Sequence, residues 1–246
     1  VATRLVTQES MDLVNEAEEL EDIGYITMLI DRFKEAKYEF HSDRKISERI
    51  TELEGYVKDF NYLNEEYQEK VLEKIIKGRP ADGYSRSSNT IKALSNQLPD
   101  AVLNSAILKN DAAKLQNLIV SYEITNYTAL PRAQRGELVQ FIIDEKLAAD
   151  EYVEVTVEEF KTSVETSITS YTGKIEAVNA AENKGAMQTA LEAVYPEYKA
   201  LGAVDKLDIA EALYDAKKAA GEEFVKYTTF AQIRAAVDAV IADLGL

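Results

Sequence analysis

The chain has 246 residues, of which 46% are hydrophobic, and it carries a formal net charge of −16 with no cysteine. This composition excludes disulfides, zinc–thiolate sites and cysteine nucleophiles, and the acidic balance disfavours nucleic acid and anionic membrane surfaces as partners. No stretch is long and apolar enough to predict insertion into a membrane.

The residue usage predicts an all-α fold. The chain has only four prolines and ten glycines, and alanine, glutamate, lysine and leucine are abundant, which favours helices over sheets. We expect helices over about 7–23 and 26–40, followed by an additional helix over about 42–58. This additional helix has apolar residues at helical spacing: Ile46, Ile50, Leu53 and Val57.

The next predicted helix covers Glu65 to Lys77. Asn64 is its candidate N-cap, and acidic residues in its first turn suit the helix dipole. The run from Gly78 to Gly83 contains two glycines and a proline and predicts a loop.

Three later helices have clear start signals. Pro131 fits the first position of a helix, where a missing N–H is harmless. Thr156 and Thr229 each begin a capping-box sequence, so we expect a helix after each. The only sustained alternation of β-branched residues, 152–157, is too short to build a sheet.

A repeat underlies these elements. Three leucines anchor equivalent positions, with 67 residues from Leu63 to Leu130 and 71 from Leu130 to Leu201. The step from a capping residue to an apolar residue is four positions in each copy: Ser87 to Ile91, Thr156 to Phe160 and Thr229 to Ile233. An Asn near the start recurs as Asn15, Asn104 and Asn179. Repetition of this length is typical of stacked helical modules.

We therefore predict tandem three-helix-bundle modules that share long helices in an elongated array. The expected domains are 1–103, a first module with the additional helix; 104–175, a second three-helix module; and 176–246, a third one. A helix that continues from 163 to 181 is the expected connection between the last two modules.

Candidate catalytic groups are few. His41 is the single histidine and lies in a polar junction, where a surface role is the usual one, so a Ser–His–Asp site has little support. Acidic pairs such as Glu158–Glu159 and Glu222–Glu223 could serve a glycosidase, but they stand at helix starts or on polar faces. We predict no catalytic site and no enzyme.

The fourteen tyrosines have two interpretations. Tyrosines recur near the anchoring leucines, as Tyr62, Tyr127 and Tyr198, and before the last helix of each copy, as Tyr84, Tyr152 and Tyr227. Packing between helices, with each hydroxyl bound to a loop, is the favoured interpretation. The alternative is a face of aromatic rings that binds carbohydrate or protein.

The third copy resembles a helical module of large surface proteins of Gram-positive bacteria, including S-layer-type proteins. The resemblance rests on Val178–Ala181, Met187–Leu191, Asp205–Leu213 and Ile233–Ile241, and on the Arg79-Pro80 to Gly83-Tyr84 loop of the first copy. It implies an extracellular location at the bacterial cell surface and a structural role: self-assembly or spacing, with partners that are further copies or other surface proteins. Because the sequence begins with Val1, we also expect a processed form or a fragment.

Two alternatives to this function stay open. The first is a module that binds a cell-wall polymer, for which Lys70, Lys74, Lys77 and Arg79 are the candidate residues at helix spacing. No cofactor is required, although calcium is a candidate cation for so acidic a chain. The second alternative is a structural protein of a phage.

Overall fold

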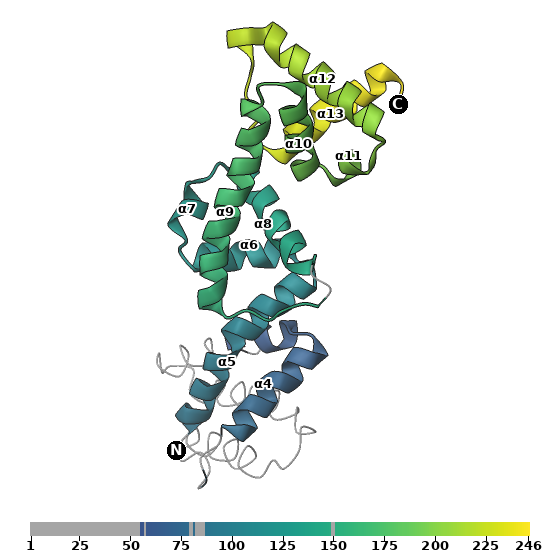
Figure 1. The fold of residues 1–246 in the computed structure, drawn as a ribbon. Coiled ribbons are helices and arrows are strands. Elements are labelled where there is room, and N and C mark those ends of the chain that lie inside the picture. The colour runs from purple at the N-terminus through teal and green to yellow at the C-terminus, as the bar shows by residue number, and fades with distance from the viewer. Residues whose placement is uncertain (1–54, 57, 79–80, 82–86, 149–150) are drawn as a thin grey trace. The chain divides into compact units, whose positions relative to one another are not determined.

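The computed structural model describes residues 55–56, 58–78, 81, 87–148 and 151–246 (Figure 1). The helices expected over 7–23 and 26–40, most of the additional helix, His41, Arg79 and Tyr84 lie outside the described residues.

Within the described residues every regular element is a helix, so the prediction of an all-α chain is confirmed there. In chain order the helices are α4 (Glu65–Lys77), α5 (Ser87–Leu108), α6 (Ala112–Ser121), α7 (Thr125–Ala129), α8 (Arg132–Leu147), α9 (Val157–Ala180), α10 (Lys184–Val194), α11 (Pro196–Ala200), α12 (Ala203–Ala220), the 3-10 helix η2 (Gly221–Glu223) and α13 (Phe230–Leu244). Residues 152–156, which include the β-branched residues Val153, Val155 and Thr156, form no regular element and lead directly into α9.

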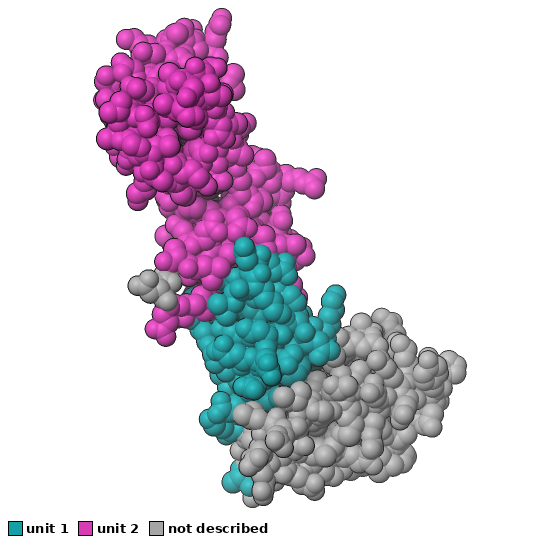
Figure 2. Space-filling model, turned by 90° about the vertical axis from the view of Figure 1, so that its right-hand side faces the viewer, with its two compact units in different colours: residues 1–111, 154–157 teal, residues 112–153, 158–246 magenta. Residues whose placement is uncertain are grey.

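The chain divides into two compact units, coloured separately in Figure 2. Unit 1 comprises 1–111 with 154–157, and unit 2 comprises 112–153 with 158–246. The three predicted domains have other limits, and their boundaries stay a prediction.

In unit 1, α4 begins and ends where the sequence predicts. The Asn64 side chain accepts a hydrogen bond from the Tyr67 N–H (3.0 Å), so it is the N-cap. The apolar face of α4 is buried, with Tyr67, Val71 and Ile75 at helical spacing.

In unit 2, the 24-residue helix α9 shows how the apolar spacing produces the core. Its buried residues recur every three to four positions and form one stripe: Phe160, Val164, Ser167, Ile168, Tyr171, Ile175 and Val178. The Ser167 hydroxyl contacts the Glu145 carboxylate of α8 (3.1 Å), and the Phe160 ring lies edge-on to Tyr122, which follows α6. The helix α9 therefore packs against the elements before it in the chain.

Two starts of helices differ in detail from the sequence prediction. The sequence predicts Pro131 as the first residue of α8. In the structure α8 begins at Arg132, and Pro131 is its N-cap. The Thr229 hydroxyl caps α13 by accepting from the Gln232 N–H (3.2 Å), as a capping box requires. The Gln232 side chain, however, accepts from the N–H of Thr228 (2.7 Å) instead of closing the box on Thr229.

The aromatic residue that precedes each anchoring leucine sits three positions before it. The N–H of each leucine bonds the carbonyl of that aromatic residue at 3.1 Å, and the three pairs are Leu63 with Phe60, Leu130 with Tyr127, and Leu201 with Tyr198. The equivalent of the two tyrosines in the first copy is therefore Phe60, and the assignment of Tyr62 to this position was wrong. Phe60, Tyr127 and Tyr198 are all buried.

The packing interpretation is confirmed for two of these tyrosines. The Tyr127 hydroxyl donates to the carbonyl of Arg135 (3.3 Å), and the Tyr198 hydroxyl donates to that of Lys206 (2.6 Å). Each bond spans eight residues and closes the turn from a five-residue helix to the next long one. Burial raises the pKa of both hydroxyls, so both stay protonated donors at neutral pH.

We expect Tyr198→Phe to lower the free energy of unfolding by about 1 kcal/mol, because the Lys206 carbonyl loses the bond from the buried Tyr198 side chain. Tyr127→Phe, whose bond is longer, should cost less. Urea denaturation followed by circular dichroism measures both. Tyr195→Phe, which removes an exposed bond to Asp238, is the control and should change little. If Tyr195→Phe and Tyr198→Phe lowered the free energy of unfolding equally, the idea that burial makes the Tyr198 bond the stronger contributor would be contradicted.

The recurring Asn also has one role in two copies. The Asn104 side chain donates to the carbonyl of Val155 (2.8 Å) and accepts from its N–H (2.9 Å). The Asn179 side chain makes the same two bonds to Tyr227, at 2.8 and 2.9 Å. In both places, an amide near the end of a long helix holds the segment that leads into a later helix, α9 for Asn104 and α13 for Asn179.

Candidate functional site

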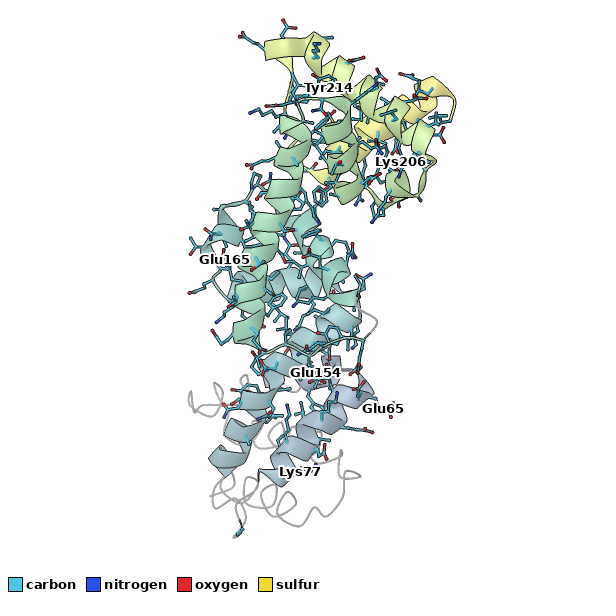
Figure 3. The ribbon with its side chains drawn as sticks, viewed as in Figure 1. Glu65, Lys77, Glu154, Glu165, Lys206 and Tyr214 are labelled. Atoms are coloured by element: carbon cyan, nitrogen blue, oxygen red, sulfur yellow. The ribbon has the colours of Figure 1, made fainter. Side chains whose placement is uncertain are left out.

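The predicted lysine row lies on α4 and is largely neutralised. The Lys70 ammonium pairs with Glu66 (2.6 Å) and with Glu154 (2.5 Å), and Lys77 pairs with Glu73. Lys74 is exposed. Figure 3 shows Glu65 and Lys77 on α4, and Glu154 on the segment before α9. Four glutamates share this helix with the three lysines, so α4 presents mixed charge rather than a basic surface.

The pair between Lys70 and Glu154 joins α4 to the segment that enters α9. The Lys70 hydrogen bond lowers the pKa of the Glu154 carboxyl, and bonds to Glu154 and Glu66 raise the pKa of Lys70. Tyr67 and Lys74 also favour the charged form of Glu154. The two shifts describe one interaction, a partly exposed ion pair between Lys70 and Glu154.

We expect Lys70→Met to return the pKa of the Glu154 carboxyl toward its ordinary range, as NMR titration would show. A lowered carboxyl pKa stabilises the fold above the unfolded value of about 4.3, and this stabilisation is lost as the pH falls through the folded pKa. The variant should therefore show a shallower loss of stability in acid. Lys77→Met is the control, since its partner is Glu73. An unchanged Glu154 titration in Lys70→Met would contradict this assignment.

A second junction, within unit 2, is centred on Glu137 of α8. One oxygen of this carboxylate, Oε2, accepts from the Tyr171 hydroxyl (2.6 Å) and from the N–H of Phe230 (2.7 Å). The other, Oε1, accepts from the N–H of Ala231 (2.6 Å). Phe230 and Ala231 are the first residues of α13, so Glu137 satisfies two N–H groups that the helix cannot pair internally.

Side chains around Glu137 pack closely. The rings of Tyr171 and Phe230 lie 4.6 Å apart, Phe141 lies within 6.0 Å of both, and Lys174 lies 4.5 Å above Phe141. Burial and the hydrogen bond to Glu137 raise the pKa of Tyr171 far above its usual value, so its hydroxyl stays a donor. Glu137 thus joins α8, α9 and α13.

Glu137 is not among the predicted site residues, although its distance from the anchoring leucine matches that of Lys70. Glu137 is seven residues after Leu130, and Lys70 is seven residues after Leu63. Both side chains bind the part of the chain around the start of a later long helix. The residues four positions after these leucines also bind the chain just before a later long helix. Tyr67 bonds Glu154, and Gln134 donates to the Thr228 carbonyl (2.8 Å). Because the residue types differ, the similarity appears only once the contacts are known.

Beside Glu137 lies an open groove of about 400 Å³, called here the junction groove. Its apolar lining includes Phe141, Val194, Pro196 and Phe230. Acidic side chains from α8, Asp144 and Glu145, contribute to one part of the lining, and Lys174 of α9 and Arg234 of α13 contribute to others. Such a groove suits an apolar side chain flanked by charges of both signs.

The described residues hold no group of three or more His, Asp or Glu side chains placed to bind a metal ion. None of the described helices combines the length and hydrophobicity that crossing a bilayer requires.

Comparison of the chain with protein-family models, with curated proteins and with solved structures gives no match.

Proposed function

We propose that the chain is a non-catalytic structural segment of an extracellular, S-layer-type bacterial surface assembly, in which it supports self-assembly or spacing. In this proposal it is a tandem array of three-helix modules that share long helices. The observation that carries it is the repeated Asn clamp, from Asn104 to Val155 and from Asn179 to Tyr227. Equivalent contacts in successive copies are a property of repeat arrays, in which each module is stabilised by its neighbour.

Further support comes from the way α9 belongs to two sets of contacts. Tyr171 bonds Glu137 of α8, and Asn179 near the end of the same helix bonds Tyr227 before α13. The Lys217 ammonium of α12 binds the carbonyl oxygens of Asn179 and Ala181 at the end of α9. A long helix held at its middle and at its C-terminal end connects the two sets of contacts, which suits a structural segment.

Sedimentation velocity of the purified chain over a wide concentration range tests this function. We expect larger species to form as the concentration rises. A chain that stays monomeric throughout would remove self-assembly from the proposal. A phage structural protein would also assemble, so it shares this physical expectation.

The polymer-binding alternative has a separate test. Co-sedimentation with Gram-positive cell-wall sacculi, with and without calcium, would detect it. Because Lys70 and Lys77 are paired with carboxylates, we expect no pelleting above background. Specific pelleting that is lost on stripping the wall polymer, and weakened in Lys74→Glu, would favour the binding module over the spacer.

A further inference from the structure

The loop between α12 and α13 presents an exposed apolar side chain on a rigid support. Val225 is 84% exposed, although Phe224 before it and Tyr227 two residues after it both make contacts within unit 2. The Phe224 ring lies edge-on to Tyr227 at 5.6 Å and under the Lys217 ammonium, and both backbone groups of Tyr227 bond to Asn179. The exposure is therefore a fixed feature of the surface.

Charged residues of opposite sign flank Val225 in the sequence. Glu222 and Glu223 precede it and Lys226 follows it, and all three are exposed. The 221–226 loop thus carries acidic, apolar and basic side chains in sequence. The loop starts at Gly221, whose φ of 52° is the left-handed conformation that glycine adopts without strain.

The junction groove has the complementary set of groups. Phe141, Val194 and Pro196 provide apolar surface for a valine, and Asp144 and Glu145 provide carboxylates for a lysine. Lys174 and Arg234 provide cations for the two glutamates. Opposite charges around an apolar centre give an interface both orientation and specificity.

We propose that the 221–226 loop of one copy of this chain docks in the junction groove of a second copy, with Val225 on the apolar lining and Lys226 against Asp144. The loop and the groove are different surfaces, so the contact is heterologous, and each copy keeps one free loop and one free groove. A contact of this kind continues from copy to copy and builds a ring or an open chain of molecules, according to the rotation between copies. This inference rests on the proposed self-assembly and specifies its contact.

The second copy of the repeat contains an exposed valine, Val153, that can be compared with Val225. Val153 is 72% exposed and lies two residues before Val155, as Val225 lies two residues before Tyr227. The residue after Val153 is Glu154, which already pairs with Lys70 and has the wrong sign for the carboxylates of the groove. We therefore expect only the 221–226 loop to dock.

Sedimentation velocity of full-length variants tests the contact. We expect Val225→Asp, Lys226→Glu and Asp144→Lys each to weaken association about tenfold or more, since each puts a like charge or a desolvated charge in the contact. The matched control Val153→Asp should associate like the wild type. The double variant Lys226→Glu/Asp144→Lys, which exchanges the two charges, should recover most of the association.

A mixture of two variants tests the heterologous geometry. Val225→Asp retains its groove, and Asp144→Lys retains its loop, so an equimolar mixture should form dimers and nothing larger. Circular dichroism spectra and melting curves confirm that each variant is folded. Wild-type assembly that persists in Val225→Asp, or that Val153→Asp abolishes equally, would overturn the contact and leave self-assembly standing. A wild-type chain that never associates would overturn both.

Discussion

Replacing Glu137 with alanine should lower the free energy of unfolding by about 2–4 kcal/mol, a large effect for one polar side chain. The substitution removes three hydrogen bonds of 2.6–2.7 Å to a charged acceptor. It leaves two N–H groups at the start of α13 and the buried Tyr171 hydroxyl without this partner. It also removes a negative charge from a helix N-terminus.

The measurement is urea denaturation combined with amide hydrogen exchange. Exchange at Phe230 and Ala231 should accelerate more than exchange in α6, because the lost bonds lie at the start of α13. Glu137→Gln should have a smaller effect, since its amide keeps one acceptor oxygen. Glu176→Ala, an exposed change on α9, is the control and should remain within about 0.5 kcal/mol. A Glu137→Ala chain as stable as this control would show that the junction contributes nothing to stability.

Asn104→Ala should lower the free energy of unfolding by about 2–3 kcal/mol, because it leaves both backbone groups of Val155 without their side-chain partner. Asn104 is only 2% exposed, and its amide also donates to the Asp100 carbonyl at 2.6 Å. Asn104→Asp should be at least as damaging, since it would place a carboxylate oxygen against two carbonyl oxygens.

The equivalent variant Asn179→Ala should cost less, about 1–2 kcal/mol, because Asn179 is partly exposed and makes the same pair of bonds. Asn126→Ala removes an exposed side-chain bond to Glu165 and serves as the control. Chemical denaturation of the four variants gives the comparison. If Asn126→Ala lowered the free energy of unfolding as much as Asn104→Ala, the stabilising role of the Asn104 bonds to Val155 would be refuted.

Local signals in the sequence determined the helical class and several helix starts. The apolar spacing of α4 and α9, the Asn64 cap and the Thr229 cap depend on residues within a few positions of one another, so the pattern alone predicts them. The recurrence of Asn104 and Asn179 was also visible in the sequence, although it indicated only a recurring position and not what the side chains bind.

The tertiary structure alone decided what the recurrent positions do. The Asn clamps span 51 and 48 residues, and Glu137 reaches residues 93 and 94 positions later. Contacts at such separations depend on how helices pack, which periodicity does not encode. The pair of Lys70 with Glu154 also depends on packing, since it spans 84 residues. The pairs of Lys70 with Glu66 and of Lys77 with Glu73, and the bond from Leu63 to Phe60, are local contacts three or four residues apart. The sequence determined which faces become buried, and packing determined which side chains meet.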